Sequence, residues 1–471
     1  MSNTDIGHIR LAKAPIGRRA SGEGLTRLNT LVFWLLVALL AIAPIPFGSA
    51  RAIYWGALAA AIGLVGMVYC ALLVWMRQAP RIAPAALWPQ AVLWVAVCAW
   101  LVVQVLPLGG LPIPLPDGTT LDAGTISIAP GMTLLMLARQ LGYGLFFFLI
   151  LQTLANGRRR RLLFDVLLCI IIAHGVYGMI SLRSGDTILG LEKWAYNGYA
   201  TGTFVNRNSY ATFLAMGSII AAGRFGHVLA RGFAHHRDDG RPPHFWSSLV
   251  IYAVAYVFLV TVILSTASRM GLFVTVVGTI VALAVLLQGV RGKGMLLALV
   301  PVILAAIAVA MVFFGVGLFE RLGGVETSAQ VRGDFYRQIW ELILLRPLTG
   351  FGGGSFELAF PLVHALPVST DRVWNLAHNT YLALWSELGL VAGSLVILSV
   401  GLVAARIGHA VIRRQGNLEA QAIALGSLVA CALHSLVDFS LEIPANTLIF
   451  LALLAAGAAS AVTAPPAGAD R

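Results

Sequence analysis

Runs of about twenty apolar residues recur along most of this chain and constrain its fold more than any other feature of the sequence. Of the 471 residues, 59% are hydrophobic and only 11% are charged, whereas about a quarter of the residues in a water-soluble domain are charged. A segment that crosses a bilayer must satisfy its backbone hydrogen bonds internally, which favours α-helices of this length. The sequence therefore predicts an all-α polytopic membrane protein.

The apolar runs predict about twelve transmembrane helices. They are expected at residues 30–47, 53–76, 85–107, 131–154, 162–182, 208–230, 246–264, 271–290, 295–317, 379–403, 419–436 and 444–463. All four cysteines lie within these runs without CxxC spacing, so we assign them no chemistry.

The basic residues predict how the chain is oriented. The formal charge is +12, from 32 basic and 20 acidic residues, and the cations gather in the N-terminal tail and in alternate loops, as at residues 158–161. Such loops mark the cytoplasmic side, so the charge indicates topology and not nucleic-acid binding. We expect a cytoplasmic tail at 1–29, spans within 30–317, a large periplasmic loop at 318–378, spans within 379–463 and a cytoplasmic tail at 464–471.

Polar clusters interrupt the apolar pattern, and the predicted topology places them all on the outer side. Residues 202–208 include Asn206, Arg207 and Asn208, which either cap a helix beside an interfacial arginine or contribute to a site. Ser268 and Arg269 follow two other hydroxyl side chains at a short turn. There the arginine either extends to the headgroups or offers a planar fork of donors to a phosphate.

The large loop carries Arg332, Tyr336 and Trp340, followed by glycines at 350 and 352–354. Because no Gly-Lys-Ser/Thr sequence follows, the glycines do not indicate nucleotide binding. We expect them to allow a close backbone path beside a substrate or a neighbouring helix.

The loop ends at His378-Asn379-Thr380-Tyr381, which places a histidine at the start of a predicted membrane helix. If that helix includes His378, then His378, Tyr381 and Trp385 share one face. Glu387 then lies on the opposite face, where it is expected to brace a neighbouring helix.

Two further polar groups leave alternatives open. His434, Asp438 and Glu442 follow one another at spacings of four residues and form either a packed seam or part of the same cavity. Arg139 lies eight residues into a predicted span, where it is either functional or extends to the outer surface. The sequence shows no metal-ligand spacing, so neither a metal nor another cofactor is expected.

Several short motifs together resemble the O-antigen ligase and polysaccharide polymerase superfamily of bacterial membrane glycosyltransferases. They are TFVNRN at 203–208, SRMG at 268–271, PLTGFG at 347–352 and AHNTYL at 377–382. HSLVDF at 434–439 is similar to a signature of many exopolysaccharide-cluster members.

The resemblance implies a GT-C-like enzyme of the bacterial inner membrane with its active site facing the periplasm. It implies transfer of a glycan from undecaprenyl diphosphate to an acceptor glycan, with no nucleotide sugar, metal or nucleic acid. Arg207 and Arg269, with Arg332 as a further candidate, are expected to bind the diphosphate, and His378 is expected to be catalytic. The expected supporting residues are Asn206, Asn208, Ser268, Asn379, Tyr381, Glu387, His434 and Asp438.

The sequence leaves the acceptor open. The first prediction is a ligase, the named activity of the family, which uses a lipid A-core acceptor. The alternative is a polymerase, which extends a carrier-linked repeat, and protein O-glycosylation by the same chemistry is a further alternative. Outside this class, about twelve spans would also suit a transporter or flippase, although the sequence shows no matching halves.

Overall fold

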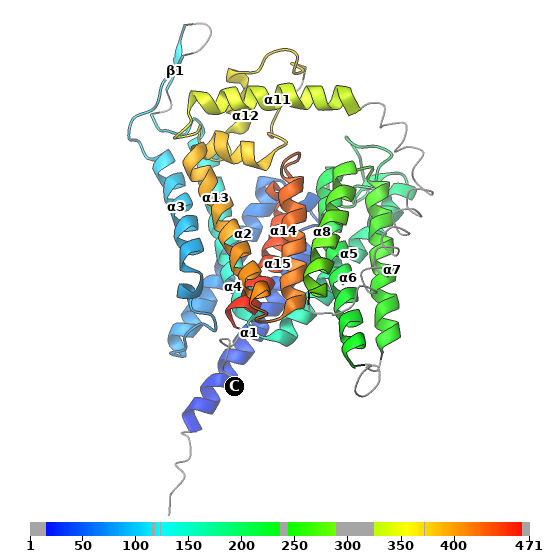
Figure 1. Ribbon diagram of the computed structural model, residues 1–471. Helices are drawn as coiled ribbons and strands as arrows, with labels where there is room; N and C mark the ends of the chain where they lie inside the picture. Colours follow the sequence, from blue (N-terminus) through cyan, green and yellow to red (C-terminus); the bar gives the residue numbers. More distant parts are fainter. Residues whose placement is uncertain are drawn as a thin grey trace, which may run out of the picture.

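The computed structural model describes residues 16–114, 118–122, 124–235, 244–288, 325–371 and 373–463. Long helices stand side by side in a bundle, and α11 (Val325–Leu345) lies across one end of it (Figure 1). Ten of the helices in these ranges are long and apolar enough to cross a membrane. The prediction of an all-α polytopic membrane protein is therefore confirmed.

The bundle is built mainly from long helices. They are α1 (Ile16–Ile42), α2 (Ala52–Trp75), α3 (Trp88–Val105), α4 (Pro130–Leu154), α5 (Gly157–Arg183), α6 (Arg207–His235), α7 (Phe245–Ser265), α8 (Arg269–Leu287), α13 (Thr380–Ile412), α14 (Leu418–His434) and α15 (Pro444–Val462). The shorter helical elements are η1 (Phe47–Ser49), η2 (Pro84–Leu87), α12 (Phe356–Ala359), η3 (Phe360–Leu362) and η4 (Ser440–Glu442). Two antiparallel hairpins pair β1 (Ile113–Pro114) with β2 (Thr120–Leu121) and β3 (Thr187–Ile188) with β4 (Leu191–Glu192).

Each predicted span that falls on described residues coincides with one of these helices. The predicted span at 295–317 lies outside the described residues, and α14, at 17 residues, is shorter than a usual spanning helix. The count of about twelve spans therefore stays a prediction. Part of the tail predicted at 1–29 is helical. The helix α1 begins at Ile16, well before the apolar stretch of that helix begins.

Small residues allow the central helices to pack closely. The interior of the bundle contains α15, the most buried of the membrane-spanning candidates, and α6. Gly278 on α8 and Gly426 on α14 face each other so closely that a Cβ on either would meet the other's carbonyl oxygen, at 2.8 Å and 2.5 Å respectively. Such contacts are typical of helix pairs in membranes, where close packing replaces the hydrophobic effect.

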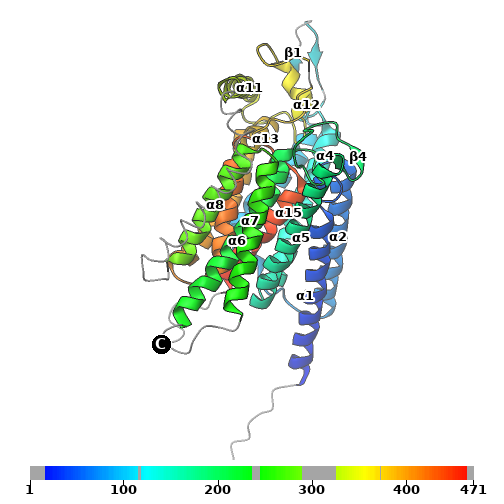
Figure 2. The same ribbon diagram turned by 90° about the vertical axis from the view of Figure 1, so that its right-hand side faces the viewer.

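The segment predicted as a large loop contains the amphipathic helix α11. Its buried side chains Phe335, Ile339, Leu342 and Ile343 recur at helical spacing and pack on an aromatic cluster that includes Phe356. Figure 2 views α11 nearly end-on above the bundle. Describing 318–378 only as a loop was therefore incomplete, because the charged residues between these apolar positions hid their periodicity.

A break in α13 anchors this segment to the bundle. Gly389 has φ 81° and ψ 164° inside the helix, which frees backbone groups from helical hydrogen bonds. Residues 347–352 take up these groups: the N–H of Gly352 donates to the carbonyl of Glu387 (2.9 Å), and the N–H of Leu390 donates to the carbonyl of Pro347 (2.7 Å). Gln104 on α3 donates to the Glu387 carbonyl as well (2.9 Å).

The glycines at this contact have a steric role, as the sequence predicted. Gly350 has φ 66°, and a Cβ there would lie 2.3 Å from the carbonyl oxygen of Glu387. The backbone can follow this path only without a side chain.

The predicted topology places both termini in the cytoplasm and the segment from α11 to α13 outside. We expect a cysteine introduced at the exposed Thr370, in a variant without the native cysteines, to react with a membrane-impermeant maleimide in intact spheroplasts. A cysteine at Ala79, exposed on a predicted cytoplasmic loop, is the control and should react only after permeabilisation. The opposite pattern would contradict the topology.

Candidate active site

His378 lies just before α13 and not within it. Its φ of 51° is left-handed, so the helix begins one residue later. Asn379 caps α13 by accepting hydrogen bonds from the backbone N–H groups of Tyr381 (3.0 Å) and Leu382 (3.1 Å). The predicted helical face joining His378 to Tyr381 and Trp385 is therefore wrong, because a positive φ interrupts helical geometry.

Two segments distant in sequence hold His378 in place. From α11, the hydroxyl of Tyr336 donates to the carbonyl oxygen of His378 (2.8 Å). From the turn after α14, the carbonyl oxygen of Ser435 accepts from the N–H of Thr380 (3.0 Å). The ring of Phe439 also packs edge-on against the imidazole, with centroids 4.9 Å apart. The histidine is thus fixed between α11 and the HSLVDF segment.

Asp438 is the buried centre of a polar network behind this histidine. Its carboxylate is 1% exposed and accepts hydrogen bonds from the side chains of Asn208 (2.9 Å) and Ser440 (2.8 Å). The Ser440 hydroxyl also lies 3.2 Å from Nδ1 of His434. The packed seam expected for His434 and Asp438 is present, and it joins the start of α6 to the turn that contacts His378.

Arg207 begins α6 beside an aromatic wall. The preceding Asn206 accepts from the N–H groups of Asn208 (2.7 Å) and Ser209 (3.1 Å), so the helix-cap interpretation of Asn206 is correct. The guanidinium of Arg207 lies 4.8 Å from the centroid of the Tyr199 ring, and its buried Nε has no hydrogen-bond partner among the described residues. An arginine held this way keeps a donor available for a ligand.

Arg269 begins α8, next to α6. A Cβ added at Gly271 would lie 2.5 Å from the Cβ of Ala211, so the first turns of α8 and α6 are in close contact. The hydroxyl of Ser268 caps α8 by accepting from the N–H of Gly271 (3.1 Å). The same hydroxyl still has a proton to donate, so its expected role in binding a phosphate stays a prediction.

Arg332, near the start of α11, completes a group of three arginines. Arg207 interacts electrostatically with both Arg269 and Arg332, and Arg332 also acts on His378 and Tyr336. Burial raises the pKa of Tyr336 to about 12, although the charge of Arg332 opposes this. With Asp438 as the buried carboxylate nearby, the group has an excess of positive charge.

His378 is suited to accept a proton. Burial lowers its pKa below the ordinary 6.5, and the charge of Arg332 acts in the same direction, while Asp438 opposes them. The imidazole is therefore neutral at pH 7 and free to act as a base. The Asp438 carboxylate would stabilise the imidazolium that forms once a proton is taken up.

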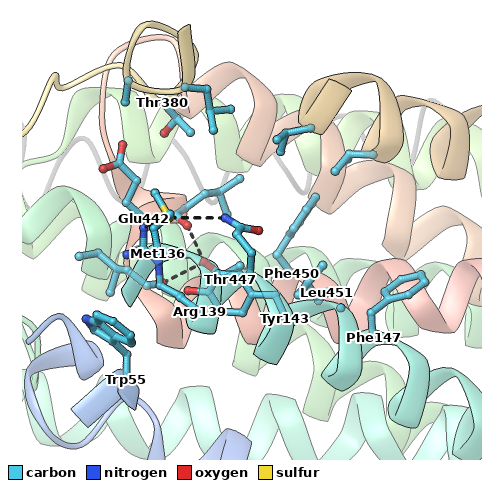
Figure 3. A pocket seen from close by; sticks show the side chains of 18 of the residues that line it. Trp55, Met136, Arg139, Tyr143, Phe147, Thr380, Glu442, Thr447, Phe450 and Leu451 are labelled. Carbon is cyan, nitrogen blue, oxygen red and sulfur yellow. Dashed lines mark hydrogen bonds between the residues drawn. The ribbon is translucent and has the colours of Figure 1, made fainter. Parts of the chain in front are cut away.

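A cavity of about 1020 Å³ opens beside His378. Tyr196, Asn206 and Asn375 line it near the α11 end, and Ile82 and Gln152 line it toward the opposite end. Its walls are largely aromatic and aliphatic, and Figure 3 shows Arg139, Tyr143 and Glu442 on one part of them, with Phe450 and Leu451 further along. A long apolar chain with a polar head fits such a space.

The structure brings together most of the predicted site. Arg207 interacts with Arg269 and Arg332, and Arg332 interacts with His378, so the three arginines form one group that reaches the histidine. Tyr381 instead donates to the carbonyl of Ala432 (2.9 Å) and so holds α13 against α14.

The side chain of Glu387 is buried and accepts from the backbone N–H groups of Gly354 and Phe356, so it braces the segment around α12.

Sequence reasoning missed two contributors to this region. Tyr196 lines the cavity and accepts from Nδ2 of Asn206 (3.1 Å). Gln104 ties α3 both to α13, through the carbonyl of Glu387, and to the segment before α12, through the carbonyl of Thr349. Gln104 could have been found from the sequence, because a glutamine inside a predicted span is unusual. Tyr196 gave no comparable signal, because it is an aromatic residue in a short loop.

The fold and the site define a multi-pass membrane protein with a basic, histidine-containing site at one end of its bundle. Residues 254–397 match the family model described as O-antigen ligase. The match includes Arg269, Arg332 and His378, and it confirms the resemblance to the O-antigen ligase and polysaccharide polymerase superfamily. It supports a ligase- or polymerase-type function in polysaccharide biosynthesis. None of the curated proteins compared with the chain matches it.

Proposed function

We propose that this protein is a metal-independent, inverting glycosyltransferase of the O-antigen ligase type, acting at the periplasmic face of the bacterial inner membrane. Its donor is an undecaprenyl-diphosphate-linked glycan, and its acceptor is the lipid A-core oligosaccharide. The observation that carries the proposal is the group formed by Arg207, Arg269 and Arg332, in which Arg332 acts on the partly buried, neutral His378.

The arginines supply the charge that the donor needs. As the bond between C1 of the donor sugar and the diphosphate oxygen breaks, the diphosphate leaves with the electron pair. Positive groups already in place stabilise that developing charge without reorganisation. Arginine suits this role because its planar fork donates two parallel hydrogen bonds to a phosphate.

His378 supplies the base. The acceptor hydroxyl oxygen attacks C1 from the side opposite the diphosphate, so the configuration at C1 inverts, and its proton passes to the imidazole. Asp438 stabilises the resulting imidazolium, and the proton is later released to water. The products are the extended acceptor and undecaprenyl diphosphate.

A polymerase that extends carrier-linked repeats is the second candidate. The observation that favours it is the direct packing of Phe439, within the exopolysaccharide-type HSLVDF segment, on the ring of His378. A transporter or flippase, in contrast, would have no need of a base at this position, so the His378 variants separate it from both enzymes.

We expect His378→Ala to abolish measurable glycan transfer while binding of the carrier lipid persists, because the arginines lie on other segments. General-base catalysis contributes about 10² to 10⁴ in rate. His378→Gln keeps a hydrogen-bonding group but cannot accept a proton at neutral pH, so it should be nearly as inactive. The assay is purified protein in detergent with carrier-linked glycan and acceptor, in the presence of EDTA.

The control is His364→Gln, on the segment between η3 and α13, which should leave transfer unchanged. Transfer by His378→Gln near the wild-type rate would show that the histidine only orients a substrate. A requirement for added divalent metal would contradict the metal-independent mechanism.

Arg269→Lys keeps the charge and loses the planar fork. We expect a substantially lower rate of transfer in the same assay, with normal accumulation of the protein in the membrane. Arg406→Lys, on α13 near the opposite end of the bundle, is the matched control. Unchanged turnover in both Arg269→Lys and Arg269→Ala would leave this arginine with an anchoring role alone.

A further inference from the structure

The cavity beside His378 has a polar region that the mechanism above does not use. Arg139 on α4 and Glu442 on η4 both line it, together with Tyr143 and Thr447 (Figure 3). Both are deeply placed: Nε of Arg139 and Oε1 of Glu442 are buried and have no hydrogen-bond partner among the described residues. Buried polar atoms are almost always paired, so two unpaired atoms in one cavity point to a ligand.

Arg139 has only weak partners within the protein. Its Nη2 lies 2.9 Å from the sulfur of Met136, and its guanidinium lies 5.7 Å from the centroid of the Trp55 ring. It interacts electrostatically with Glu387 and Glu442 but forms no ion pair with either in the part of the chain that the structure describes. An arginine within a spanning helix is costly unless it serves a function.

Glu442 can both donate and accept a hydrogen bond. Burial raises the pKa of its carboxyl to about 8, and the neighbouring Glu387 acts in the same direction, while Arg139 opposes them. The group is therefore largely protonated at pH 7. A protonated carboxyl beside an arginine matches neutral hydroxyl groups, which also donate and accept, better than it matches a dianionic diphosphate.

The rest of the cavity is apolar. Phe147, Phe450 and Leu451 lie toward the end away from Glu442 in Figure 3. The two regions together suit a molecule with a hydroxyl-rich head on a hydrocarbon chain, and Trp55 offers an aromatic face beside the polar region.

The position of His378 assigns this cavity to one of the two substrates. His378 lines the cavity, whereas Arg207, Arg269 and Arg332, all within the described ranges, do not. His378 also interacts with Arg332, so it borders both the cavity and the basic group. A substrate hydroxyl that reaches His378 from the cavity would therefore meet a glycan donor whose diphosphate is bound by the arginines.

We propose that the cavity is the binding site of a lipid-linked acceptor saccharide, with Arg139 and Glu442 binding hydroxyl groups of its sugar. The hydrocarbon chain of the acceptor occupies the region of Phe147, Phe450 and Leu451. The assignment to the acceptor rests on the proposed function, because it takes His378 as the point of transfer.

Binding measurements on the full-length protein in nanodiscs test this without turnover. The probes are farnesyl glucoside, farnesol, which lacks the sugar, and farnesyl diphosphate, which reports on the arginine side. We expect Glu442→Leu and Arg139→Met each to weaken farnesyl glucoside binding about tenfold, the effect of losing one hydrogen bond to a charged or strongly polar group. Binding of farnesol and farnesyl diphosphate should not change.

Two controls keep the test decisive. Glu341→Gln, exposed on α11, should leave all three affinities unchanged. Thermal unfolding checks that each variant is folded, and Arg139→Met carries the test if Glu442→Leu does not accumulate. Unchanged farnesyl glucoside binding in the folded variants, an equal loss for farnesol, or a loss confined to farnesyl diphosphate would each overturn the proposal. Because no transfer is measured, failure of the His378 mechanism would not alter these results.

Discussion

The break of α13 at Gly389 is the constraint on which the rest of this structure depends. A membrane offers no water to backbone groups that leave a helix, so the protein itself must pair them. Residues 347–352 and Gln104 do so, and Gly350 has no side chain that would prevent the approach. This contact ties the C-terminal end of α11 to α13, because residues 347–352 follow α11 directly. The position of the site is therefore set by backbone hydrogen bonds more than by side chains.

From that anchor, the site is assembled from segments far apart in the chain. Tyr336 on α11 and Ser435 after α14 hold the backbone around His378 from two directions. Asp438 links the same turn to Asn208 at the start of α6. Burial and the charge of Arg332 then keep His378 neutral at the edge of the arginine group, which is the combination that the proposed proton transfer and diphosphate departure would require. Arg207 and Arg269 begin α6 and α8, and Arg332 lies on α11, so rigid elements hold the charges close together despite their repulsion.

The sequence predicted much of this because apolar length and helix caps are local signals. The spans on described residues, the cap at Asn206 and the closeness of the arginines to His378 all follow from such signals together with topology. Three features did not follow. The periodicity of α11 was hidden by its charges, the positive φ of His378 has no sequence signal in a non-glycine residue, and the pairing of Gln104 with the α13 break depends on tertiary contact.

The central claim is that the three arginines and His378 form one site for the carrier diphosphate. An electron cryomicroscopy structure of the protein in nanodiscs with undecaprenyl diphosphate tests it most directly. The account predicts diphosphate density among Arg207, Arg269 and Arg332, on the side of His378 away from Glu442. Density for the diphosphate beside Arg139, or at the end of the bundle opposite α11, would contradict it.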